Sequence, residues 1–217
     1  MATSTSVIKP QYDFDYPDFS SVAGLVLRGH AQQVENFLRV TRSTGNQGGA
    51  AWYERLMNVA EGFTTTFTFS ITERAGFVGN GGDGFSFNVH TIGFDTIVGE
   101  QGTANQLSIQ FDTFQNAGDP SDNFVRINYL YQVVAECNLY ELDTPINIKD
   151  DNRHSVEIAL IDAKLIVILD GISVASAKVS CAQFSPAIVG FGARSGHAWE
   201  NHDIHSWQFT AGGPRRA

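Results

Sequence analysis

The stretch that decides the fold runs from Gln106 to Tyr129 and reads QLSIQFDTFQNAGDPSDNFVRINY. It begins with a run in which apolar side chains occupy every second position, namely Leu107, Ile109 and Phe111. A second such run follows the polar loop 115–123, with Val125, Ile127 and Tyr129 on one face. Alternation with a period of two predicts strands that bury one face. The stretch therefore predicts two neighbouring β-strands joined by a polar loop.

The end of the first strand and the loop after it supply several oxygen atoms. Asp112 shares a face with Gln110, and Asn116 follows in the same register if the chain stays extended. Asp119 comes three residues later, between a Gly and a Pro that can turn the chain back. Two carboxylates, an amide and free carbonyl groups suit Ca²⁺, which takes roughly 6–8 oxygen ligands. The alternative is a surface loop in which Asp and Asn only form turns.

The segment FDTFQN, at 111–116, followed by GDPS, at 118–121, resembles the metal-binding segment of the L-type, or legume-type, lectins. In that family the same strand and loop hold a Ca²⁺ ion, and one loop Asn contacts both the metal and the sugar. The resemblance implies a Ca²⁺ site in which Asp112 and Asp119 are carboxylate ligands. Phe114 would bind through its carbonyl oxygen and Asn116 through its amide oxygen. It also implies that Asn116 binds sugar.

Two positions depart from the family pattern. The family usually has a Glu and a His that ligate a transition metal, usually Mn²⁺, beside the Ca²⁺. Here those positions hold Gln110 and Phe124. An amide is a poor replacement for a carboxylate, and a phenyl ring cannot ligate a metal. We therefore expect no Mn²⁺ site and a single Ca²⁺, as in the animal cargo-receptor lectins of the same superfamily.

A second motif, Gly82-Asp83-Gly84, resembles the A-D-G motif of the family, in which the Asp accepts hydrogen bonds from two sugar hydroxyls. A carboxylate can accept two such bonds at once. Read alone, the motif favours a turn that uses Asp, and together with Asn116 it favours a sugar contact. Gly82 departs from the small residue with a Cβ that is common there. The loop 91–105 contributes backbone amides to the sugar site in the family, with Gly99 and Gly102 as candidates here.

A third region of resemblance lies near the C-terminal end. VGFGARSG, at 189–196, and HDIHSW, at 202–207, are similar to paired family segments that enclose a loop setting sugar specificity. His197 and Trp199 are thus candidates to bond a hydroxyl or stack on a sugar face. The alternative for Trp199 is an ordinary loop aromatic that packs against the sheet.

The rest of the chain fits one antiparallel β-sandwich of the concanavalin A-like jelly-roll type over residues 12–210, with a flexible lead-in, 1–11, and a tail, 211–217. The first strand is expected from Tyr12. Further strands are expected at 36–41, 63–71, 85–89, 130–134, 154–160, 165–169, 172–179, 188–193 and 202–209, with loops at 74–84, 91–105 and 194–201.

Composition excludes several functions. The 217 residues include 23 acidic and 14 basic side chains, and the net charge of −9 argues against nucleic acid. No apolar run is long enough to span a membrane. The opening MATSTSVIKPQ lacks the core of a signal peptide, which leaves a cytosolic protein or a mature form with an added Met. The two cysteines, Cys137 and Cys181, are expected to be free thiols.

Catalysis is not expected. Jelly-roll glycosidases of the laminarinase type use two carboxylates in an E-x-D-x-x-E pattern, but Gln110 and Gln115 occupy the outer positions here. An amide can neither donate a catalytic proton nor attack the anomeric carbon. His202 and His205 are expected on opposite faces of a strand, which argues against a shared metal. The sequence predicts a non-catalytic, Ca²⁺-dependent domain whose partners are glycans or glycoproteins, and the resemblance allows a homodimer. The alternative is a structural or protein-interaction domain that has lost metal and sugar.

Overall fold

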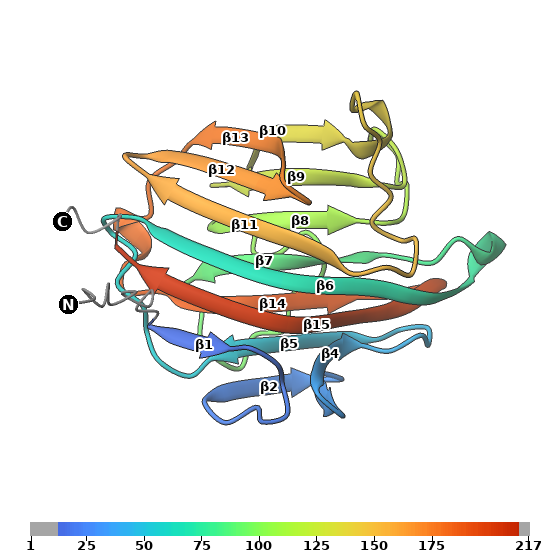
Figure 1. Cartoon of the computed structure of the whole chain (residues 1–217), viewed down its shortest axis with the longest axis horizontal. Helices are drawn as coiled ribbons and strands as arrows, with labels where there is room; N and C mark the ends of the chain where they lie inside the picture. Colours follow the sequence, from blue (N-terminus) through green and yellow to red (C-terminus); the bar gives the residue numbers. More distant parts are fainter. Residues whose placement is uncertain (1–12, 213–217) are drawn as a thin grey trace, which may run out of the picture.

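The computed structural model of the chain describes residues 13–212, which form two antiparallel β-sheets stacked face to face (Figure 1). Within this range one sheet has eight strands: β1 (Phe14–Tyr16), β3 (Gln32–Val34), β4 (Phe37–Thr41), β6 (Phe63–Gly76), β11 (His154–Ile161), β12 (Lys164–Leu169), β13 (Ile172–Lys178) and β15 (Ala198–Ala211). The other has seven: β2 (Leu25–Gly29), β5 (Gly48–Tyr53), β7 (Gly84–His90), β8 (Leu107–Asp112), β9 (Phe124–Tyr129), β10 (Gln132–Asn138) and β14 (Ile188–Arg194). The prediction of an all-β antiparallel sandwich is confirmed.

Short 3₁₀ turns interrupt three connections, at η1 (Phe77–Gly79), η2 (Leu139–Glu141) and η3 (Ala182–Phe184). No helix among the described residues is long and apolar enough to cross a membrane. The predicted lead-in 1–11 and the tail residues 213–217 lie outside the described range.

The order of the strands brings distant parts of the sequence together. The eight-stranded sheet runs β13-β12-β11-β6-β15-β4-β3, with β1 also paired to β15, and the seven-stranded sheet runs β10-β9-β8-β7-β14-β5-β2. Strand β7 lies between β8 and β14 and is antiparallel to both, so its first residue, Gly84, pairs with Asp112 at the end of β8 and with Arg194 at the end of β14. The loops before β7, after β8 and after β14 therefore meet at one end of the sandwich.

The core between the sheets is built from aromatic rings. Alternation along β6 buries Phe63, Phe67 and Phe69 on its inner face, as the Thr-Phe pattern predicts. The Phe67 ring contacts Phe69 and reaches rings from three strands of the opposite sheet: Phe85, Phe87, Phe111 and Phe191. Burial of each such ring contributes roughly 1.5–3 kcal/mol. The core thus fixes how the two sheets face each other.

Three predicted boundaries were wrong. The expected strand at 130–134 is interrupted because Leu130 and Tyr131 adopt positive φ angles of 50° and 66° and form the turn between β9 and β10. Strand β6 continues into the expected loop 74–84 as far as Gly76. It does so because β15 starts at Ala198 and pairs with it there, so half of the expected loop 194–201 belongs to β15. The end of β6 and the start of β15 are set by their pairing with each other, which cannot be predicted from local composition.

Cys137 and Cys181 are free thiols, as expected. Cys181 is buried in the main core, and burial raises the pKa of its thiol to about 12. The thiol is therefore uncharged at neutral pH and behaves as a small apolar side chain.

The segment 91–106 crosses the outer face of the seven-stranded sheet instead of projecting into solvent. Gly99 accepts a hydrogen bond from Ser86 Oγ (2.7 Å), and Thr96 accepts one from Trp52 Nε1 (2.9 Å). A small second apolar cluster lies beneath the segment and contains Ala50, Trp52, Val98 and Ile188. The crossing segment brings Gly99 toward the same end of the sandwich as Asp83.

Candidate functional site

The loop end of the sandwich, as we call the region where the loops before β7, after β8 and after β14 meet, lies opposite the chain termini in Figure 1. Asp83 is held there through its backbone: its N–H donates to the Arg194 carbonyl (3.0 Å) and its carbonyl accepts from the Thr113 N–H (3.1 Å). The Gly82–Asp83 peptide bond is cis. These two backbone bonds, one to the end of β14 and one to the residue after β8, fix the position of the Asp83 backbone.

Gly82 replaces the small residue with a Cβ that is common in the resembling family, and the packing explains why. Its φ is +151°, a conformation that side chains disfavour, and a Cβ built there would lie 2.9 Å from Phe114 Cβ. Phe114 packs closely over this residue, so the Asp83 turn directly touches the loop 112–119, which holds the predicted metal ligands. The structure thus brings together two motifs that are about 30 positions apart in the sequence.

Arg194 links the Asp83 carboxylate to a second buried carboxylate. Its Nε donates to Asp83 Oδ2 (3.2 Å) and its Nη2 donates to Glu100 Oε1 (2.9 Å). The Arg194 side chain is 54% exposed, whereas that of Asp83 is 16% exposed and Glu100 is fully buried. Burial raises the pKa of both carboxyl groups, and the Arg194 charge opposes that rise. Asp83 Oδ1 accepts no hydrogen bond from any described residue and remains available for a ligand.

The four predicted metal ligands lie in one compact loop. Asp112, which is buried, accepts the Phe114 N–H at Oδ1 (3.0 Å). The Asn116 N–H donates to Asp119 Oδ2 (2.9 Å), and Asn116 Nδ2 lies 3.4 Å from the Phe114 carbonyl oxygen. Each of the four predicted ligands therefore contacts another member of the set. Their donor atoms are all oxygen, which suits Ca²⁺.

The electrostatics of Asp112 also fit a bound cation. Burial above all, with smaller contributions from the nearby charges of Glu100 and Asp119, raises the pKa of Asp112 to about 8. A divalent cation would compensate these negative charges and favour the ionised carboxylate. No group of three or more His, Cys, Asp or Glu side chains in residues 13–212 is placed to hold a metal. The predicted set depends instead on two carboxylates with carbonyl and amide oxygens.

The position next to this loop does not fit a second metal. Gln110 Nε2 donates to Asp112 Oδ2 (2.7 Å), and Gln110 Oε1 accepts from Asn128 Nδ2 (3.1 Å), so the amide is used on both sides. The buried Phe124 ring lies beneath the guanidinium of Arg126, whose Cζ is 4.5 Å from the ring centre. The Phe124 side chain therefore makes a cation–π contact with Arg126 and supplies no metal ligand.

Arg126 was not identified from the sequence, yet it holds the loop with the predicted metal ligands, residues 112–119, in place. Its Nη2 donates to Asp119 Oδ1 (2.9 Å), and its Nε donates to Glu136 Oε2 on β10 (2.6 Å). Asp119 Oδ2 accepts the Asn116 N–H, so Arg126 positions Asn116 through Asp119. The only sequence signal was a basic residue on the outer face of a strand, three residues after the polar loop 115–123.

Thr113, the residue after Asp112, is held by hydrogen bonds with buried polar side chains that were not identified from the sequence. Lys149 Nζ donates to the Thr113 carbonyl (3.1 Å) and to Asp122 Oδ2 (2.6 Å). Glu200 Oε1 accepts from Thr113 Oγ1 and from His202 Nε2, the latter at 3.1 Å. These contacts join the loop 112–119 to β15 and to the η2–β11 connection. The loop end is therefore a buried network of polar groups and not a set of free surface loops.

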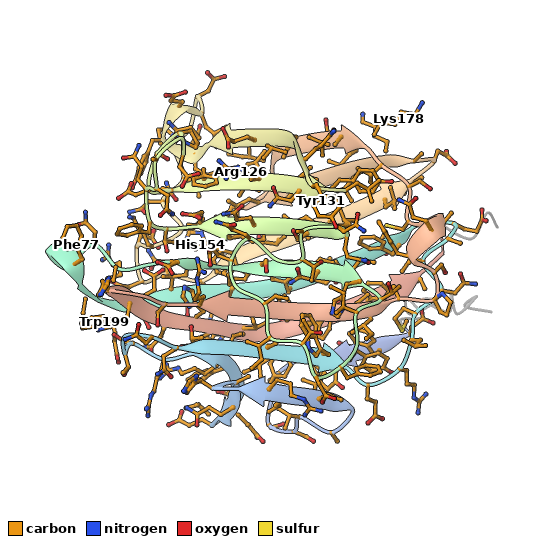
Figure 2. The ribbon with its side chains drawn as sticks, turned by 180° about the vertical axis from the view of Figure 1, so that it is seen from behind. Phe77, Arg126, Tyr131, His154, Lys178 and Trp199 are labelled. Carbon is orange, nitrogen blue, oxygen red and sulfur yellow. The ribbon has the colours of Figure 1, made fainter. Side chains whose placement is uncertain are left out.

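The remaining predicted sugar contacts lie at the loop end in different settings. Gly99 is adjacent to Arg194, since a Cβ built on Gly99 would lie 3.1 Å from Arg194 Cβ. His197 is exposed, and its carbonyl accepts the Phe77 N–H (2.8 Å). The half-buried Trp199 ring packs on Gly76, where a built Cβ would lie 2.7 Å from Cε3, and Figure 2 shows Trp199 and Phe77 at the same end of the molecule. The sugar-binding roles of these three residues stay predictions.

Comparison with known proteins identifies the family. Residues 11–217 match the model of the legume lectin domain. The chain belongs to the legume lectin family. A relative of this legume lectin domain, a lectin-like protein of Arabidopsis thaliana, is 32% identical in an alignment of 187 positions that covers 68% of this chain and 67% of the relative.

Solved lectin structures share the fold of this legume lectin domain. The lectin from Bauhinia forficata in complex with GalNAc has a TM-score of 0.72 at 23% identity, covering 90% of this chain and 96% of that one. The exoplasmic/lumenal domain of VIP36 in its Ca²⁺/Man3GlcNAc-bound form has a TM-score of 0.72 at 13% identity, covering 94% and 90% of the two chains. The predicted concanavalin A-like sandwich and the predicted lectin family are confirmed.

Proposed function

We propose that this legume lectin domain binds a saccharide at the loop end through Asp83 and Asn116. The observation that carries the proposal is the state of the Asp83 carboxylate. Arg194 engages one carboxylate oxygen and the backbone is fixed at both ends, while the other oxygen has no partner among the described residues. A carboxylate fixed in this way accepts hydroxyl hydrogen bonds in a defined direction. A rigid site suits sugars because their hydroxyls exchange water for protein at little net gain.

We further propose that one Ca²⁺ ion organises the site. Asp112 and Asp119 would hold it with their carboxylates, Phe114 with its carbonyl oxygen and Asn116 with its amide oxygen. When bound, the ion would supply positive charge that fixes the Asn116 amide, whose present contact is to the Phe114 carbonyl. Gln110 and Phe124 offer no ligands for a second, transition-metal ion, so we expect Ca²⁺ without Mn²⁺.

The proposed activity is binding without catalysis. At the positions where a laminarinase-type enzyme has two carboxylates, Gln110 is hydrogen-bonded between Asp112 and Asn128, and Gln115 is exposed. Neither amide can act as nucleophile or as acid and base. The partners we expect are glycans or glycoproteins. The Bauhinia lectin binds GalNAc and VIP36 binds a mannose glycan, and both sugar types are natural first probes.

A second function is favoured by two arginines at the same end. Arg194 already pairs with Asp83 and Glu100, and Arg126 already pairs with Asp119. Carboxylates that already pair with arginines do not need a metal ion to balance their charge. Such pairs would also stabilise a lectin-fold domain that has lost metal and sugar binding and serves as a structural or protein-interaction domain.

A glycan array with Ca²⁺ and with EDTA tests the proposal. The wild type should bind at least one glycan in Ca²⁺, EDTA should abolish that binding, and Asp83→Ala and Asn116→Ala should each remove it. Asp95→Ala is the matched control, because Asp95 is an exposed carboxylate paired with Arg28 on the loop that crosses the sheet. A silent array together with no heat of Ca²⁺ binding in calorimetry would favour the structural alternative.

A further inference from the structure

Arg194 is the last residue of β14, and its side chain lies on the outer face of the seven-stranded sheet. Ala193 before it belongs to the core, and neighbouring residues of a strand point to opposite faces. Gly99 of the crossing segment lies against Arg194, since a Cβ built on Gly99 would be 3.1 Å from Arg194 Cβ and 3.5 Å from Nε. Because residue 99 has no side chain, Arg194 has room to reach both Asp83 and Glu100.

The guanidinium of Arg194 keeps hydrogen-bond donors that no described residue uses. A guanidinium carries five N–H groups in one plane and has no acceptor. In residues 13–212 only two of them have acceptors, with Nε on Asp83 Oδ2 (3.2 Å) and Nη2 on Glu100 Oε1 (2.9 Å). Both N–H groups of Nη1 and one of Nη2 are left over, on a side chain that is 54% exposed. A ligand at Asp83 therefore meets free donors beside the carboxylate.

Glu100 holds the guanidinium in this position. The Glu100 side chain is fully buried, and Arg194 is the only basic group among the described residues that pairs with it. Its second oxygen, Oε2, has no hydrogen-bond partner there. A buried carboxylate that loses its cation is strongly unfavourable, so the contact with Arg194 persists. Ordering a long side chain normally costs conformational entropy, and here the buried Glu100 has ordered Arg194 before any ligand binds.

The carboxylate of Asp83 is open on one side. Gly196, in the β14–β15 connection, faces it, since a Cβ built there would lie 3.6 Å from Asp83 Oδ2 and 3.8 Å from Oδ1. Arg194 occupies Oδ2, which leaves Oδ1 as the free acceptor. One free acceptor thus lies next to several free donors. Two carboxylates already face the single guanidinium, so this group has no excess positive charge to attract an acidic sugar.

Two adjacent hydroxyl groups of a neutral sugar match this arrangement. A hydroxyl both donates and accepts hydrogen bonds. One hydroxyl can donate to Asp83 Oδ1 while its neighbour accepts from Arg194. This pairing differs from the one that the Gly82-Asp83-Gly84 motif predicts, in which the carboxylate accepts from two hydroxyls.

We propose that Arg194 is a specificity-determining residue of the saccharide site. It donates to the oxygen of one hydroxyl, next to the hydroxyl that donates to Asp83, and Glu100 is the positioning residue that holds it there. The inference rests on the proposed function and extends it, because it assigns the ligand as a neutral sugar whose two adjacent hydroxyls have opposite hydrogen-bonding roles.

Deoxy and deoxyfluoro sugars distinguish a hydroxyl that accepts from one that donates. A fluorine accepts a hydrogen bond weakly and cannot donate one, whereas a hydrogen on carbon does neither. The parent sugar would be whichever of GalNAc, galactose and mannose binds best in Ca²⁺. Competition experiments would measure the Kd of this sugar and of its deoxy and deoxyfluoro analogues at each ring hydroxyl.

The wild type should give different results at two neighbouring hydroxyls. At the hydroxyl that accepts from Arg194, the deoxy analogue should bind roughly 10-fold more weakly than the parent, and the deoxyfluoro analogue less than about 3-fold more weakly. At the hydroxyl that donates to Asp83, both analogues should lose roughly 10-fold or more, because neither can donate.

The double variant Arg194→Met with Glu100→Gln removes the donors without leaving a buried charge unpaired. The difference between the deoxy and deoxyfluoro analogues at the first hydroxyl should disappear, while both should remain weak at the second. Glu100→Gln alone keeps an oxygen for Nη2 and should retain the difference, whereas Glu100→Leu should reduce it. Arg28→Met is the matched control, because Arg28 pairs with Asp95 of the crossing segment away from Asp83, and it should change nothing. Thermal unfolding of each variant checks that the fold is intact.

Two results would overturn the role of Arg194 and leave the proposed function standing. One is a wild type whose deoxy and deoxyfluoro analogues bind equally at every hydroxyl. The other is a difference that persists unchanged in the double variant, as expected if Arg194 only balances the charges of Asp83 and Glu100. A wild type that binds no sugar in Ca²⁺ would overturn both proposals.

Discussion

The interior of the sandwich and its loop end are both buried, but they are built from opposite chemistry. Between the sheets, aromatic rings such as Phe67, Phe85 and Phe111 pack against one another. At the loop end, buried or half-buried carboxylates are balanced by arginine and lysine side chains, in the groups Asp83–Arg194–Glu100, Asp119–Arg126–Glu136 and Asp122–Lys149. The interior stabilises the fold wherever its rings touch, whereas the loop end is stable only while each charge keeps its partner.

The strongest test of the interior is truncation of one central ring. Phe67→Ala should lower the free energy of unfolding by about 3–5 kcal/mol, because it removes a ring that contacts three strands of the opposite sheet and leaves a cavity. Urea unfolding measures this. The control Phe77→Ala, at a 60% exposed ring of the loop end, should change stability by less than about 0.5 kcal/mol. Equal effects of the two changes would show that the core is not where the structure places it.

A buried histidine under the crossing segment predicts a pH effect. Burial lowers the pKa of His90 from 6.5 to about 4. The unfolded chain therefore binds a proton below pH 6.5 that the folded chain binds only near pH 4. Stability from this group is complete above pH 6.5 and is lost as the pH falls toward 4, by up to about 3 kcal/mol.

Replacement of His90 by Asn should remove this part of the acid destabilisation. The Asn side chain can still accept the Ile92 N–H that His90 Nδ1 accepts now (3.3 Å), although the edge contact of the ring with Trp52 is lost. Urea unfolding from pH 7 to pH 4 should give a shallower slope than the wild type, with His30→Asn, at an exposed position, as control. An unchanged slope in His90→Asn would contradict the prediction.

The ion pairs of the loop end should be worth more than those on the surface. Arg126→Met leaves Asp119 and Glu136 without their cation and should cost about 1–3 kcal/mol in the absence of Ca²⁺. Arg28→Met breaks the exposed pair with Asp95 and should cost about 0–1 kcal/mol. Chemical denaturation in EDTA measures both. A larger loss in the Arg28 variant would reverse the ranking that burial predicts.

These two regions also differ in how far the sequence predicts them. Alternation in the segments 63–71 and 107–129 identified the core strands, because one buried face leaves a periodic pattern. The ends of β6 and β15 were missed, since their pairing joins residues more than a hundred positions apart. Resemblance pointed to Asp83 and to the loop 112–119, and the structure places them in contact.

The partners of those residues could not be predicted. Arg194, Glu100, Arg126 and Lys149 come from four separate segments, and no local pattern links a basic residue to a carboxylate that the fold later brings beside it. Tyr131 was expected within a strand, whereas its exposure follows from a turn with positive φ angles. Polar networks and turns depend on tertiary contacts, and composition alone does not report them.

Calorimetric linkage between Ca²⁺ and sugar tests the central claim most directly. The glycan that binds best on the array would be titrated into the protein with saturating Ca²⁺ and with EDTA, and Ca²⁺ would be titrated with and without that glycan. The account predicts one Ca²⁺ per chain, at least a tenfold gain in glycan affinity when it is bound, and the same gain in Ca²⁺ affinity when the glycan is bound, as linkage requires. Glycan affinity that is identical with Ca²⁺ and with EDTA would contradict it.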